Sequence, residues 1–195
     1  METNGKTMTG EDSLRIITEM INTTKVNFSQ SSFHFRFWGW LILVCSLADY
    51  LLSNFTGINN SWYVWLLTIP GAIISMVYGY VKGSRSKIYT YGDMLNMWTW
   101  MGFFFAAIIL FILMRDNMGS AGPFILLLAA FPTFLTGKII RFKPLVAGGV
   151  SMWILALVAG LTGPSVSPLA VPVAMITGYL IPGYLIKRKE THDAV

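Results

Sequence analysis

The stretch WYVWLLTIPGAIISMVYGYVK, residues Trp62–Lys82, decides the fold class because it is almost entirely apolar and long enough to cross a bilayer as a helix. Within it, Gly71, Ser75 and Gly79 recur at every fourth position. Residues at that spacing lie on one face of a helix, where small side chains let a second backbone approach closely. The stretch therefore predicts a membrane-spanning helix that packs through a ladder of small residues.

Two later apolar spans carry the same ladder, and each ladder ends on glycine. The local strings SMVYGYV, TFLTGKI and AMITGYL align at that glycine. Two explanations stay open. One is a three-fold repeat of helix pairs, whose even-numbered spans would gather around one centre; the other is the general enrichment of small residues where membrane helices meet. The later ladders are Ala129, Thr133 and Gly137, and then Ala170, Ala174 and Gly178.

Composition and charge place the chain in a membrane. It is 54% hydrophobic and 12% charged over 195 residues, whereas soluble domains carry about 25% charged residues. The basic residues fall into four segments on one side of a six-span topology, and the opposite connections contain only Arg115. The positive-inside rule then predicts an all-α integral membrane protein with six transmembrane helices and both termini in the cytoplasm. The four segments contain Lys6, Arg15 and Lys25; Lys82, Arg85 and Lys87; Lys138, Arg141 and Lys143; and Lys187, Arg188 and Lys189.

The net charge of +5 does not indicate a nucleic-acid partner, because the basic residues follow the topology and form no patch. Membrane lipid is the expected environment. The N-terminus contains no short apolar stretch with a cleavage site, so we expect no cleaved signal peptide.

The remaining segments lie outside the spans. Residues 1–12 are polar and predicted to be a disordered cytoplasmic N-terminus, and residues 187–195 form a basic cytoplasmic tail. Residues 13–26 place their apolar side chains on one arc behind Ser13, a good helix N-cap, which predicts a cytoplasmic amphipathic helix. This helix is expected to lie on the membrane surface, or else to dock on the bundle or on a second subunit. Residues 35–186 form the six-span domain, and His34 and Arg36 at its start are expected to reach the headgroups.

Prolines in the even-numbered spans suggest where a ligand site could form. Pro70, Pro132 and Pro172 each precede the ladder glycine of their span. A proline inside a helix frees a backbone carbonyl, which membrane proteins tolerate where it faces protein or a water-filled cavity. The alternative is that these prolines only bend their helices.

Asp49 is the one acidic residue well inside a span, and no basic residue lies at its depth. Acidic residues inside a membrane are costly and commonly functional, so Asp49 is the first candidate ligand-binding residue. A structural acid held by hydrogen bonds is the competing interpretation. The other candidates are its helical neighbours Ser46 and Tyr50, and the residues that precede the ladder glycines, Tyr78, Thr136 and Thr177.

No motif indicates an enzyme. The chain lacks the zinc-protease, phosphate-loop and Gly-x-Ser-x-Gly patterns, so we expect no catalytic activity, cofactor or metal. Cys45, the single cysteine, is expected to be a small apolar filler.

Three stretches carry a resemblance to known proteins: Ser13–Ile17, Phe37–Leu41 and Gly178–Tyr184. They resemble an uncharacterised group of six-span bacterial inner-membrane proteins, which implies a bacterial inner membrane and no particular activity. The size and topology are also similar to the substrate-binding subunits of energy-coupling-factor vitamin transporters.

Two functions follow as expectations. The first is a small-molecule or ion binding or transport protein with a cavity between proline-kinked helices. The alternative is a regulatory or scaffold membrane protein that recruits a partner protein or forms a homo-oligomer through its small-residue faces and residues 13–26.

Overall fold

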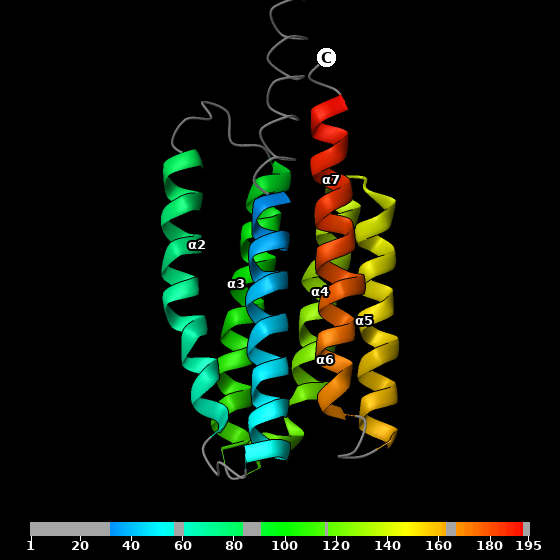
Figure 1. Cartoon of the computed structure of the whole chain (residues 1–195). Helices are drawn as coiled ribbons and strands as arrows, with labels where there is room; N and C mark the ends of the chain where they lie inside the picture. Colours follow the sequence, from blue (N-terminus) through cyan, green and yellow to red (C-terminus); the bar gives the residue numbers. More distant parts are fainter. Residues whose placement is uncertain (1–31, 57–60, 84–90, 116, 163–166, 193–195) are drawn as a thin grey trace, which may run out of the picture.

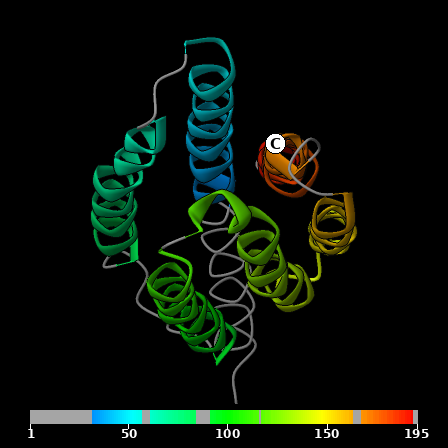
Figure 2. The ribbon, with the colours of Figure 1, turned by 90° about the horizontal axis from the view of Figure 1, so that it is seen from below.

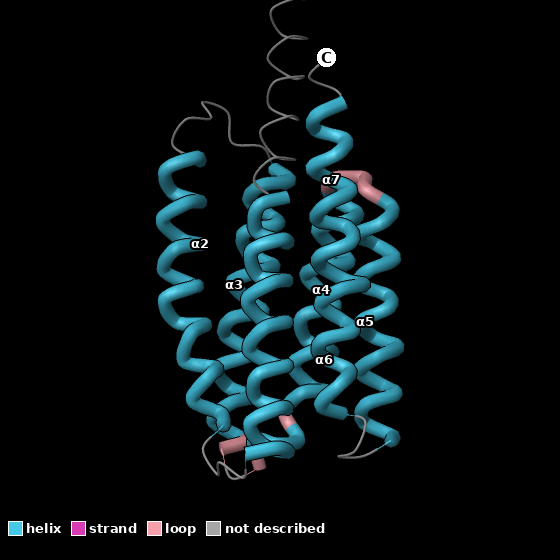
Figure 3. Tube along the Cα trace, viewed as in Figure 1, coloured by secondary structure: helices cyan, strands magenta, loops and turns pink. Residues whose placement is uncertain are grey.

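The computed structural model describes residues 32–56, 61–83, 91–115, 117–162 and 167–192, and in these ranges every regular element is a helix (Figure 3). The expected N-terminal segment 1–12 and amphipathic helix 13–26 lie outside the described residues. Six helices are long and apolar enough to cross a membrane, as expected of a multi-pass membrane protein. They span Ser32–Phe55, Ser61–Val81, Tyr91–Leu113, Gly122–Ile139, Lys143–Thr162 and Pro168–Lys189. The prediction of an all-helical chain with six such helices is confirmed.

Three of the six spans are regular helices and three change helix type. The regular spans are α3 (Tyr91–Leu113), α4 (Gly122–Ile139) and α5 (Lys143–Thr162), with a short 3-10 turn, η3 (Met118–Ser120), before α4. The first helix ends in a π-helical turn, η1 (Leu52–Thr56), and the second span joins a 3-10 segment, η2 (Ser61–Leu67), to α2 (Thr68–Gly83). The sixth span consists of α6 (Ser167–Met175), a π-helical turn η4 (Ile176–Leu180) and α7 (Ile181–His192). Helix α7 therefore continues into the segment expected to be a tail.

The spans follow one another around the bundle in chain order, and the sixth returns beside the first (Figures 1 and 2). Two hydrogen bonds tie these two spans together. The Ser32 hydroxyl donates to the Gly183 carbonyl over 3.2 Å, and the Trp40 indole donates to the Tyr184 hydroxyl over 3.1 Å. The first helix thus lies between α2, which follows it in the chain, and span 6, the last span.

The densest packing joins α4, α5 and span 6, because glycines let their backbones approach. A Cβ on Gly149 would lie 2.8 Å from the backbone nitrogen of Phe134, and one on Gly137 would lie 2.7 Å from that of Val146. A Cβ on Gly148 would lie 3.0 Å from the Gly178 carbonyl oxygen. These contacts hold α5 between α4 and η4 at backbone distance.

The three ladders each face a neighbouring helix of the same chain. Gly71 lies against Leu41 of the first helix, Gly137 against the start of α5, and Gly178 against Met152 of α5. The even-numbered spans do not gather around one centre. Figure 2 places α2 apart from α4 and span 6, with the first helix and α3 between them.

Two prolines of the even-numbered spans lie where the helix type changes, and two lie inside α-helices. Pro70 lies in the first turn of α2, directly after the 3-10 segment η2, where a missing N–H is tolerated. Pro132 lies inside α4 and Pro172 inside α6. Pro182 follows the π-helical turn η4 as the second residue of α7.

Candidate functional site

Hydrogen-bonding side chains of α3 and α4 meet inside the bundle. The Thr136 hydroxyl, which is 1% exposed, donates to the Asn96 carboxamide oxygen over 2.6 Å. The Trp100 indole donates to the same Thr136 oxygen over 3.2 Å. Asn96 and Trp100 lie one turn apart on α3, so both reach the same residue of α4.

Span 6 adds a second polar pair next to the first. The Tyr179 hydroxyl hydrogen-bonds with Thr133, whose own hydroxyl donates to the Ala129 carbonyl over 2.7 Å. The Phe35 ring packs edge-on against both Trp100 and Tyr179, with ring centroids 6.2 Å and 5.3 Å apart. We call the set of Asn96, Trp100, Thr133, Thr136 and Tyr179 the polar cluster.

The local sequence of span 6 explains why Tyr179 reaches this position. Tyr179 belongs to the π-helical turn η4, in which the Ile181 amide bonds back to the Ile176 carbonyl. The extra residue in such a turn re-aims the side chains that follow it, and π-helical turns inside helices are frequent at functional sites. Gly178 lets this turn lie against α5. Pro182 cannot donate a backbone hydrogen bond in the turn that follows, because it has no N–H.

The polar cluster contains donors and acceptors but no charged side chain. Thr136 bonds to Asn96 and Trp100, and Thr133 bonds to Tyr179 and to backbone. The amide nitrogen of Asn96 donates to none of the described residues. Such a set can bind a neutral molecule through hydrogen bonds, with Phe35 and Trp100 providing aromatic contacts.

Asp49 lies elsewhere, in the half of the first helix that is remote from the cluster. Its carboxylate oxygen accepts a hydrogen bond from the Trp65 indole over 3.0 Å. Asp49 follows Phe35 by fourteen residues of helix, which separates the two by about 21 Å. Ser46 donates to the Leu43 carbonyl of its own helix, and Tyr50 is half-buried.

The other predicted ligand-binding residues are also spread over the bundle. Tyr78 stacks on Phe33 with ring centroids 3.7 Å apart, and Thr177 accepts a hydrogen bond from Ser151 over 3.1 Å. Only Thr136 belongs to the polar cluster. The six candidates therefore form no common site.

His34 and Ser75 share a hydrogen bond that was not expected. His34 Nδ1 lies 2.9 Å from the Ser75 hydroxyl, in a hydrogen bond between the first helix and α2. The Trp38 indole donates to the same Ser75 oxygen over 3.1 Å. Ser75 thus links the two helices by hydrogen bonds, and its small side chain also lets them approach closely.

Sequence reasoning missed Asn96, Trp100 and Tyr179 as site residues. Asn96 had a visible signal, since it is an amide side chain within the apolar run of α3. Trp100 gave no signal of a site, because a tryptophan near the end of an apolar span is typical of the membrane interface. Tyr179 gave no signal, because its direction depends on the π-helical turn.

Comparison of the chain with known protein families, curated proteins and solved structures finds no match. The resemblances described above therefore rest on sequence motifs and topology alone.

Proposed function

We propose that this chain is a small-molecule binding or transport protein of the bacterial inner membrane, with both termini in the cytoplasm, and that its ligand binds at the polar cluster. The observation that carries the proposal is the meeting of uncharged hydrogen-bonding groups from α3, α4 and η4 inside a lipid-facing bundle. The ligand is an uncharged molecule with hydrogen-bond acceptors and an apolar or planar part.

The chemistry of the cluster decides against an ion as ligand. No carboxylate belongs to it, and Asp49 is about 21 Å along the helix from Phe35. The amide donors of Asn96, which bond to none of the described residues, favour a ligand with a carbonyl or ether oxygen. Hydrogen bonds between membrane helices add only about 0.6 kcal/mol each on average, so the bonds of the cluster contribute little stability by themselves.

Span 6 is the element that would move. Thr133, Thr136 and Tyr179 are all buried, so a ligand can reach them only when the helices around them separate. Broken and irregular helices serve this role in membrane transporters, where they line the binding site. The π-helical turn between Pro172 and Pro182 is such an irregular segment.

The recruiting alternative loses part of its support. The three small-residue faces pack against helices of the same chain, so they are occupied. A recruiting role would then depend on residues 13–26.

A thermal-stability screen in detergent tests the proposal. A ligand at 100 times its dissociation constant stabilises the folded protein by about 2.7 kcal/mol, which raises the Tm by about 5–10 °C in a protein of this size. Compounds from a panel of uncharged, hydrogen-bonding molecules should give such a shift with the wild type.

Two variants assign the shift to the cluster. Thr136→Val removes the hydroxyl shared by Asn96 and Trp100 and should abolish the shift. Thr99→Val makes the same change on α3, where the hydroxyl bonds only to the Leu95 carbonyl, and should leave the shift intact. Equal shifts in both variants would refute the assignment, and stabilisation only by ions would refute the ligand class.

A further inference from the structure

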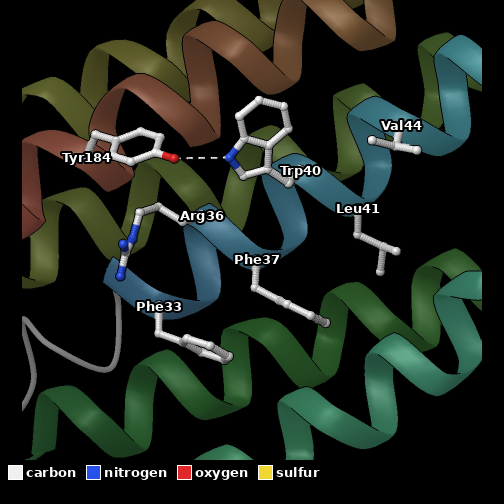
Figure 4. A pocket seen from close by; sticks show the side chains of 7 residues that line it. All are labelled: Phe33, Arg36, Phe37, Trp40, Leu41, Val44 and Tyr184. Atoms are coloured by element: carbon white, nitrogen blue, oxygen red, sulfur yellow. Dashed lines mark hydrogen bonds between the residues drawn. The ribbon is translucent and has the colours of Figure 1, made fainter.

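A groove separate from the polar cluster runs along the outer face of the first helix (Figure 4). It has a volume of about 510 Å³ and is open along its length. Most of its lining comes from helical neighbours on one face of the first helix, and the remaining wall is Tyr184 of α7. The lining residues are Phe33, Arg36, Phe37, Trp40, Leu41, Val44 and Tyr184.

One end of the groove is cationic. The Arg36 guanidinium donates through Nε to the Ser32 carbonyl over 3.2 Å and lies 5.8 Å from the centroid of the Tyr184 ring. Among the described residues, no carboxylate pairs with Arg36. Its remaining N–H groups are available for an anion, and a guanidinium matches a phosphate by two parallel hydrogen bonds.

A second donor lies beside Arg36. The Tyr184 hydroxyl accepts a hydrogen bond from the Trp40 indole over 3.1 Å, as the dashed line in Figure 4 marks. Its own proton is therefore directed away from Trp40 and can be donated to an anion.

The other end of the groove is apolar. Val44 lies eight residues beyond Arg36, about 12 Å further along the helix toward the bilayer centre. Leu41 and Val44 line this part, and the Val44 side chain is 55% exposed. A ligand that fills the groove must then be anionic at one end and apolar along the rest.

The depth of Arg36 matches a headgroup. Arg36 lies about one turn from the described start of the first helix, at the end of the bundle that also carries Lys138, Arg141 and Lys187. The positive-inside rule assigns that end to the cytoplasmic leaflet, where basic pockets between helices bind anionic headgroups.

We propose that this groove binds one anionic phospholipid of the cytoplasmic leaflet. The phosphate is held by Arg36 and Tyr184, and an acyl chain lies along Trp40, Leu41 and Val44. This site is independent of the ligand site at the polar cluster.

Native mass spectrometry of the full chain in detergent, titrated with phosphatidylglycerol or phosphatidylcholine, tests the proposal. The wild type should bind one phosphatidylglycerol in preference to phosphatidylcholine. Arg36→Gln should weaken phosphatidylglycerol binding about tenfold, the size of one charge-assisted hydrogen bond. Arg188→Gln removes the same charge from an exposed position on α7 and should leave binding unchanged.

Tyr184→Phe keeps the ring and removes the donor, so it should weaken binding several-fold even if Arg36→Gln fails to fold. Equal binding of the two lipids, or equal losses in Arg36→Gln and Arg188→Gln, would overturn the proposal. A lipid-free dimer that Arg36→Gln dissociates would also overturn it, because a second copy would then occupy the groove.

Discussion

The close contact between α4 and α5 makes Gly149→Ala the sharpest test of the packing. The added Cβ would lie 2.8 Å from both the nitrogen and the Cβ of Phe134, whereas ordinary contacts begin at 3.4 Å. The two helices would have to separate by about 0.6 Å, and interiors packed at this density resist such a shift. Overpacking against backbone costs up to about 3 kcal/mol, and the better helix propensity of alanine returns about 1 kcal/mol. We expect a net loss of about 2 kcal/mol.

Gly102→Ala is the matched control, because a Cβ at that position of α3 would meet no atom within 4 Å other than its chain neighbours and its own helix backbone. It should be neutral or stabilise the protein by up to about 1 kcal/mol. The measurement is the free energy of unfolding by SDS titration in mixed micelles, followed by near-UV circular dichroism of the tryptophans. Equal stability of Gly149→Ala and Gly102→Ala would refute the close approach of α4 and α5.

Three further changes have defined outcomes in the same assay. Gly178→Ala should cost less than Gly149→Ala, because the added Cβ meets the Met152 sulfur at 2.7 Å and a flexible thioether can move aside; a larger loss would contradict this. Trp65→Phe should cost about 1 kcal/mol of stability, because it removes the indole donor from Asp49. A double-mutant cycle with Asp49→Leu should give a coupling energy of similar size, and a coupling energy near zero would contradict the bond. Ser75→Ala removes both interhelical hydrogen bonds and should cost about 1–2 kcal/mol, and no loss would argue against that link between the first helix and α2.

The number of spans could be predicted because it depends on hydropathy and length alone. Each span is a continuous apolar run of about 20 residues, and such a run in lipid must form a helix to satisfy its backbone. The contact faces were partly predictable for the same kind of reason. The spacing of Gly71 and Gly178 marks the faces that approach Leu41 and Met152.

The candidate site could not be predicted because it depends on contacts between distant residues. Outside the cluster, the hydrogen bond from Trp65 to Asp49 likewise crosses a helix hairpin. Tyr179 reaches Thr133 only because five residues of span 6 form a π-helical turn, which shifts the register of every later side chain. Asn96 was visible as a polar residue, but its partner Thr136 lies forty residues away.

Native mass spectrometry of the wild-type protein, extracted gently from its own membrane, tests whether a ligand binds at the polar cluster. We expect a protein that carries one uncharged small molecule, which Thr136→Val loses and Thr99→Val keeps. A wild-type protein that carries no small molecule, or one retained equally in Thr136→Val, would contradict a binding site at the polar cluster.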